Sequence, residues 1–89
     1  METPATILVV EDDDGLNALM QKVLQRAGFQ TEGESKGSDA LARLGNMKAN
    51  LVMLDYLLPD MTGEEVVLRL ADQKMNVPLS LSPGMGMKK

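Results

Sequence analysis

The chain contains no cysteine, no histidine and no tryptophan among its 89 residues. Without cysteine there is no disulfide framework and no thiolate metal site, and without histidine there is no imidazole ligand or base. Any metal ion held by these residues must therefore be bound by oxygen atoms, the ligands that suit Mg²⁺ and Ca²⁺. The composition is otherwise that of a globular protein, with 44% hydrophobic and 25% charged residues. Its length predicts one domain over residues 1–89.

An excess of positive charge and a long apolar segment are also missing. The net charge is -4 and the isoelectric point is near 4.6, which argues against nucleic acid as the main partner. The N-terminus lacks a basic region, and four acids interrupt its apolar run at residues 11–14, so it does not resemble a signal peptide. No segment is long enough to cross a bilayer. We therefore expect a cytoplasmic protein with no membrane and no nucleic-acid partner.

The N-terminal third contains the clearest secondary-structure signals. Residues 6–10 (TILVV) are apolar on both faces, which is typical of a strand in a parallel sheet covered by helices. A helix is predicted from residue 14 to about residue 27, with Asp13 or Asp14 as its N-cap and Gly28 just beyond its end. Its apolar residues recur at helical spacing: Leu16, Leu19, Met20, Val23, Leu24 and Ala27.

The remaining segments continue the alternation of strand and helix. Residues 29–34 form a weaker, more polar strand that we expect at a sheet edge. Ser38 is the expected N-cap of a short helix that closes near Gly45 or Asn46. Residues 51–55 are the second strongly apolar strand, residues 59–63 a turn, and residues 64–73 a helix. Val66, Val67, Leu70 and Ala71 are expected to point inward from that helix. A last strand is predicted over residues 77–82. This order predicts a doubly wound α/β fold with a parallel sheet.

Acidic residues follow two of the predicted strands. Glu11 and Asp12 leave the first strand, and Asp55 ends the apolar strand 51–55. Ligands of such sheets bind beyond the carboxyl ends of the strands, so the carboxylates would converge if these strands are neighbours. Their mutual repulsion would be relieved by a hard divalent cation such as Mg²⁺. The sequence therefore predicts an acidic Mg²⁺ site beside an aspartate that can accept a phosphoryl group. Helix capping explains Asp13 or Asp14, but it does not explain Asp55.

Two other ligand classes fit less well. If EDDDG belonged to an EF-hand, Gly15 would occupy its sixth position, and Val10 and Gln21 would fall at positions 1 and 12, where acids are needed. The EF-hand interpretation therefore fails. A small nucleotide-binding domain is disfavoured because no glycine-rich phosphate loop follows the first strand.

The chain resembles the receiver domain of two-component response regulators. The matching segments are ILVVEDDD (7–14), GSDAL (37–41) and LVMLDYLLPDMTG (51–63), in which Pro59 and Gly63 stand at the family's offsets from Asp55. The resemblance implies a flavodoxin-like sheet, and it covers nearly the whole chain up to residue 78.

The resemblance also implies a role for each site residue. Asp55 would be the phosphoacceptor, Glu11 and Asp12 would hold Mg²⁺, and Asp55 would be a further ligand. Leu57 would lend its backbone carbonyl to the metal, while its side chain would belong to the core. The phosphoryl donor would be a phosphohistidine on a sensor histidine kinase or a phosphotransfer protein. Such a domain catalyses at most its own phosphorylation and hydrolysis, so it is not a classical enzyme.

The C-terminal segment VPLSLSPGMGMKK (77–89) departs from the family pattern. The hydroxyl that binds the phosphoryl group in the family falls on Pro83, so Ser82, the candidate phosphate ligand, stands one residue early. Because side chains alternate along a strand, Ser82 would point away from the site unless a bulge corrects the register. Ser80 would put a hydroxyl where an apolar core residue is expected. Residues 83–89, including Lys88 and Lys89, are interpreted as a tail.

The family's last strand, its lysine and the last helices have no counterpart in these 89 residues. We therefore expect impaired phosphoryl chemistry, and a homodimer formed through the exposed edge of the fourth strand. Two functions follow as hypotheses: a phospho-accepting signalling domain, and a non-catalytic interaction module or truncated receiver fragment that does not turn over.

Overall fold

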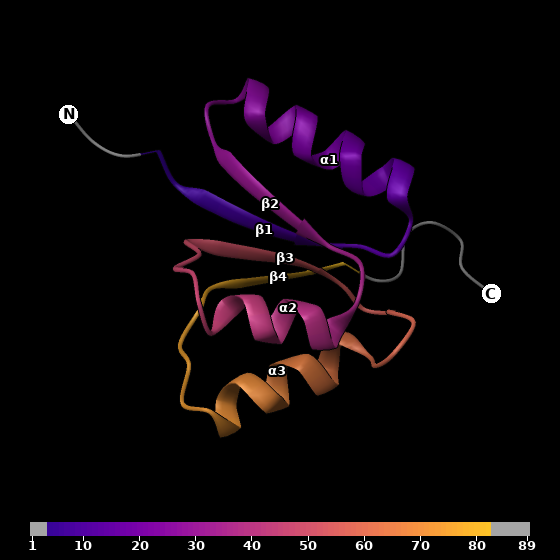
Figure 1. The fold of residues 1–89 in the computed structure, drawn as a ribbon, viewed down its shortest axis with the longest axis vertical. Coiled ribbons are helices and arrows are strands. Elements are labelled where there is room, and N and C mark those ends of the chain that lie inside the picture. Colours follow the sequence, from indigo (N-terminus) through magenta and orange to yellow (C-terminus); the bar gives the residue numbers. More distant parts are fainter. Residues whose placement is uncertain (1–3, 83–89) are drawn as a thin grey trace.

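The structure, a computed structural model, describes residues 4–82, and the predictions made for residues 83–89 lie outside this range. One parallel sheet has the strand order β2-β1-β3-β4. Its strands are β1 (Thr6–Val10), β2 (Gln30–Glu34), β3 (Leu51–Asp55) and β4 (Leu79–Ser82). One face is covered by helix α1 (Asp14–Arg26), and the other by α2 (Gly37–Leu44) and α3 (Gly63–Asp72) (Figure 1). The predicted doubly wound α/β fold is confirmed.

Strand β1 lies inside the sheet, between β2 and β3. Its residues from Ile7 to Val10 are at most 3% exposed, as expected for a strand covered on both faces. The register pairs Val10 with Leu54 of β3, so these two strands end side by side. The polar strand β2 lies at one edge and β4 at the other, as the sequence predicts.

The hydrophobic core lies between the sheet and the helices α2 and α3. Alternate residues of β1 and β3 face it, and the large side chains of Leu8, Leu54 and Val66 are fully buried there. Burying a side chain of this size contributes about 1.5–3 kcal/mol. The remaining buried members of this core are Val10, Ala40, Leu44, Ala49, Val52 and Leu70.

Helix α1 begins and ends where the sequence predicts, but its apolar residues are only partly covered. The Asp13 side chain caps the helix by accepting from the Leu16 N–H at 2.9 Å, and Gly28 follows the helix with a positive φ of 101°. Leu19 and Val23 are 57% and 58% exposed. The apolar pattern therefore identified the helix correctly. Within residues 4–82, however, the sheet covers only part of the apolar surface of this helix.

The predicted cap of α2 is wrong. The helix begins at Gly37 with Lys36 as its N-cap, and Ser38 lies inside the first turn. The carboxylate of Asp60, in the loop between β3 and α3, takes the place of a local cap. It accepts from the Gly37 N–H at 2.8 Å and from the Ser38 N–H at 2.9 Å. A negative charge is favourable at this end of a helix, so a distant residue caps α2.

Helix α3 is capped locally and begins one residue earlier than predicted. The Thr62 hydroxyl accepts from the Glu65 N–H at 3.1 Å. Val66 and Leu70 are buried as predicted and Val67 is half-buried, but Ala71 is exposed. Only a narrow face of the helix packs against the core, and Ala71 lies outside that face.

The Asp60 cap makes stability depend on pH. Desolvation raises the pKa of Asp60, but the hydrogen bonds from Ser38 and Gly37 together have the larger, opposite effect. The pKa of Asp60 therefore lies below its usual range. A carboxylate whose pKa is lowered by folding stabilises the fold fully above its unfolded pKa of about 3.9. That stabilisation is lost as the pH falls through the lower folded pKa.

We predict that Asp60→Asn is less stable than the wild type at about pH 6. The difference in the free energy of unfolding should shrink as the pH falls below about 4. Urea denaturation followed by circular dichroism measures both stabilities. Asp39→Asn, which removes an exposed acid from the same helical turn, is the matched control. A difference between wild type and Asp60→Asn that stays constant down to the lowest pH would contradict the prediction.

Candidate metal and phosphoryl-acceptor site

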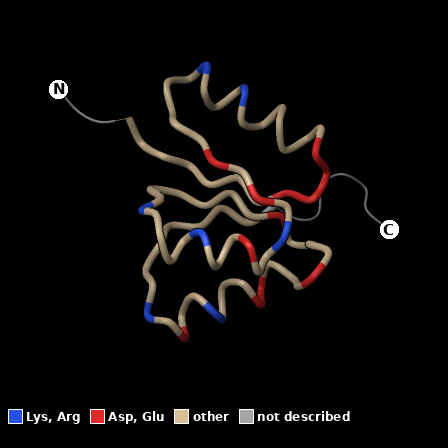
Figure 2. The backbone as a smooth tube through the Cα atoms, viewed as in Figure 1, with Lys and Arg blue, Asp and Glu red and all other residues tan. Residues whose placement is uncertain are grey.

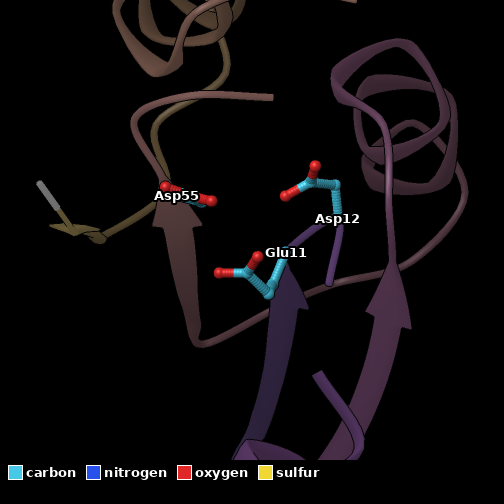
Figure 3. Close-up of side chains that lie close together, drawn as sticks. All are labelled: Glu11, Asp12 and Asp55. Atoms are coloured by element: carbon cyan, nitrogen blue, oxygen red, sulfur yellow. The ribbon is translucent and has the colours of Figure 1, made fainter. Parts of the chain in front are cut away.

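Three acidic side chains meet where β1 and β3 end. Glu11 and Asp12 directly follow β1, and Asp55 is the last residue of β3. Because the two strands are neighbours in parallel register, their carboxyl ends lie at the same edge of the sheet. Figure 3 shows the three side chains around a common space. One carboxylate oxygen from each lies within 4.8 Å of the others. The predicted convergence of these acids is thus present in the fold.

The site is largely removed from water. Glu11 is 3% exposed and Asp55 is 2% exposed, while Asp12 is half-buried. A mostly apolar pocket of about 140 Å³ adjoins Glu11 and Asp55, with Leu16 and Met20 in its wall. Repulsion between like charges is stronger beside such low-dielectric surroundings than in water.

The donor set fits a hard divalent cation. Carboxylate oxygens are the ligands that Mg²⁺ prefers, and a cation among them would relieve the repulsion. Acidic residues, drawn red in Figure 2, also gather along the chain at this end of the sheet. The three residues that could hold the ion are Glu11, Asp12 and Asp55.

The acids of residues 11–14 divide into separate structural roles. The Asp13 side chain caps α1, and its backbone N–H donates to the Glu11 carboxylate at 3.0 Å. Asp14 is exposed in the first turn of the helix. The capping interpretation is therefore correct for Asp13, and the backbone N–H of the same residue orients the side chain of Glu11.

Sequence reasoning missed Asn17, which is 8% exposed on the face of α1 toward the sheet. Its amide nitrogen donates to the carbonyl of Glu11 at 3.0 Å and to the carbonyl of Glu34 at 3.1 Å. These bonds tie the end of β1 to the end of β2. The sequence did offer one signal of its burial, because Asn17 lies between the apolar positions Leu16 and Met20 of the helix.

The loop after Asp55 is held against the phosphoacceptor candidate. The Leu57 N–H donates to the Asp55 carboxylate at 3.2 Å. The prediction that the Leu57 side chain belongs to the core is wrong, because the side chain is 40% exposed. Leu57 lies beyond the end of β3, past the stretch of sheet that α2 and α3 cover. The role of its backbone carbonyl as a metal ligand stays a prediction.

Strand β4 brings the backbone of Ser82 opposite Asp55 in the parallel register. The side chain of Ser82 lies outside the described part of the chain, so its role as a phosphate ligand stays a prediction. Ser80 is exposed, and its hydroxyl does not enter the core as the sequence led us to expect. Leu79 packs against the core, and successive residues of a strand point to opposite faces, so Ser80 points away from that core.

Within residues 4–82, none of the helices has the length and apolar character needed to span a bilayer.

Comparison with known proteins identifies the family. The family model of the response regulator receiver domain matches residues 7–84, which is most of the chain. The chain therefore belongs to the response regulator receiver domain family of two-component systems. Its fold and the placement of its acidic residues agree with this assignment.

Curated relatives are longer regulators. The chain is 37% identical over 73 residues to the alkaline phosphatase synthesis transcriptional regulatory protein PhoP of Bacillus subtilis, covering 82% of this chain and 30% of the relative. It is 32% identical over 78 residues to the probable transcriptional regulatory protein TcrX of Mycobacterium tuberculosis, covering 88% and 33%. The chain thus spans about a third of the length of these relatives.

Solved receiver structures share the fold. The response regulator MaeR bound to beryllium trifluoride superposes with a TM-score of 0.80 at 30% identity, covering 88% of this chain and 66% of MaeR. The response regulator TrrA of Thermotoga maritima, in complex with Mg²⁺ and beryllium fluoride, gives a TM-score of 0.81 at 28% identity, covering 86% and 67%. Both comparisons support the α/β fold described above.

We predict that Mg²⁺ stabilises the protein through the acidic cluster. A ligand at a hundred times its dissociation constant adds about 2.7 kcal/mol to the free energy of unfolding. Asp55→Asn should lose most of this gain, and without Mg²⁺ it should be more stable than the wild type because repulsion is relieved. Urea denaturation with and without Mg²⁺ measures both effects. Asp14→Asn is the control and should keep the gain; an undiminished gain in Asp55→Asn would contradict the prediction.

Proposed function

We propose that Asp55 accepts a phosphoryl group from a phosphohistidine of a sensor histidine kinase or phosphotransfer protein. The observation that carries the proposal is the buried carboxylate of Asp55 within 4.8 Å of ligand atoms of Glu11 and Asp12. Membership of the receiver family supports the same role, since receiver domains interact with such donors.

The proposed reaction needs little covalent chemistry from the protein. A carboxylate oxygen of Asp55 attacks phosphorus, the phosphorus–nitrogen bond of the donor breaks, and the imidazole leaves after taking a proton. Glu11, Asp12, Asp55 and the Leu57 carbonyl would hold Mg²⁺. The bound ion would neutralise charge on the transferring phosphoryl oxygens. The Leu57 N–H keeps Asp55 oriented through the bond to its carboxylate.

We also propose that this chemistry is slow in the 89-residue chain. By sequence the phosphate-binding hydroxyl position falls on Pro83, which has no side-chain donor. The same departure favours the second hypothesis, a non-catalytic interaction module that binds Mg²⁺ without forming a phosphoryl adduct.

Intact-mass measurement distinguishes the two functions. With acetyl phosphate and Mg²⁺, the first function predicts a mass increase of one phosphoryl group in the wild type, and none in Asp55→Asn. Asp72→Asn, in the last turn of α3, is the control and should behave as the wild type. Because MaeR is known bound to beryllium trifluoride, this anion is a second probe that reports adduct formation without hydrolysis. A wild type that binds Mg²⁺ but forms neither adduct would support the interaction module.

The proposed partners include a second copy of the chain. Strand β4 forms one edge of the sheet, and Leu81 on it is 48% exposed. An uncovered edge with apolar side chains favours strand pairing between molecules. Direct nucleic-acid binding by residues 1–89 stays disfavoured by the net charge of -4, whatever the longer relatives bind.

We predict a dimer at micromolar concentration that Leu81→Lys dissociates, because a charge on an edge strand opposes pairing. Sedimentation velocity measures the mass in solution. Leu68→Lys, at a residue of α3 that is 63% exposed and does not belong to the edge strand, is the control and should leave the dimer intact. A folded wild-type monomer would contradict this prediction.

A further inference from the structure

The loop between β3 and α3 connects Asp55 to helix α2 by way of Asp60. At its start, the Leu57 N–H donates to the Asp55 carboxylate at 3.2 Å. The loop closes on itself, because the Leu58 N–H donates to the carbonyl of Met61 at 3.2 Å and Leu57 bridges to Thr62. Hydrogen bonds within this short closed loop therefore connect its tip to the backbone beside Asp55.

The tip of the loop is fastened to α2. Both oxygens of the Asp60 carboxylate are used, one for the Gly37 N–H and one for the Ser38 N–H. Hydrogen bonds to an ionised group are stronger than bonds between neutral groups. The negative charge of the Asp60 carboxylate is also favourable at the N-terminus of α2.

A second contact closes the same junction. Gly37 is buried, and a Cβ there would lie 2.5 Å from Cγ of Met61, so the Met61 side chain packs directly against the backbone of α2. The start of α2 is thus held to the loop by two hydrogen bonds and by close packing against the side chain of Met61. Asp60 is itself exposed and lies outside the cluster of Glu11, Asp12 and Asp55.

We propose that Asp60 is a positioning residue for the phosphoacceptor site. By fixing the loop tip to α2, it holds the backbone of Leu57 against the Asp55 carboxylate. The role in phosphoryl transfer rests on the proposed function of Asp55, whereas the role in Mg²⁺ binding depends only on the acidic cluster. A residue that merely caps α2 would change the stability of the fold and leave the site unchanged.

The test compares Asp60→Asn with Asp39→Asn, which removes one acid from the same end of α2 without touching the loop. Tyr56 is the single tyrosine of a chain without tryptophan and lies next to Asp55, so its fluorescence reports on the site. Mg²⁺ affinity and the rate of beryllium trifluoride adduct formation are measured from its emission. The amide resonance of Leu57 is recorded by nuclear magnetic resonance in the same samples.

We expect Asp60→Asn to weaken Mg²⁺ binding and to slow adduct formation by roughly tenfold each, as for other residues that orient a ligand. The Leu57 amide resonance should shift in this variant and stay in place in Asp39→Asn. Wild-type affinity and an unshifted Leu57 amide in folded Asp60→Asn would overturn the proposal. If the wild type forms no adduct, the proposed function fails, while the Mg²⁺ and Leu57 comparisons still decide the role of Asp60.

Ser38→Pro tests the same junction from the helix side and serves if Asp60→Asn does not fold. It removes the N–H that donates to Asp60, in a first helical turn that tolerates proline, and it keeps the charge of Asp60. Mg²⁺ affinity should fall in this variant too. An affinity equal to that of the wild type would count against the proposal.

Discussion

The parallel pairing of β1 with β3 is the constraint on which the site depends. It places Glu11 and Asp55 together at the carboxyl ends of the two strands, although they are far apart in the sequence. At the other end of the same pair of strands, Thr6 bonds to the side chain of Asn50, 44 positions away. The fully apolar residues of both strands drive this pairing, because burial of Leu8, Val10, Val52 and Leu54 outweighs the repulsion it creates among the carboxylates. A stable core thus holds an electrostatically unfavourable site in place.

Polar side chains around the cluster fix the backbone that carries it. Asn17 ties the ends of β1 and β2, Asp13 orients Glu11 through its backbone N–H, and Asp60 anchors the loop that follows Asp55. Asn17 and Asp60 bond to backbone groups, whereas the N–H of Asp13 bonds to the carboxylate of Glu11 itself. Preorganisation of this kind limits the freedom of ligands that would otherwise move apart to reduce repulsion.

The sequence predicted what depends on local periodicity and on strand ends. The apolar runs 6–10 and 51–55 predicted the two inner strands, and the acids behind them predicted the site. The cap of α2 could not be found in this way, because Asp60 lies 22 and 23 positions from its partners Ser38 and Gly37. Ser38 is a good local cap by type, but a distant carboxylate reaching both N–H groups replaced it. The burial of Asn17 was missed for the same reason, since its carbonyl partners belong to two different strands.

We propose that the acids at the ends of β1 and β3 share one divalent ion. Mn²⁺, which accepts the same oxygen ligands as Mg²⁺, broadens the amide resonances of nearby residues and can be titrated into isotope-labelled protein. We expect the amides of Glu11, Asp12 and Tyr56 to broaden together at the lowest Mn²⁺ concentrations, before those of any other segment. Broadening that begins at only one of the two strand ends, or at the acids of α3 such as Glu64, would contradict it.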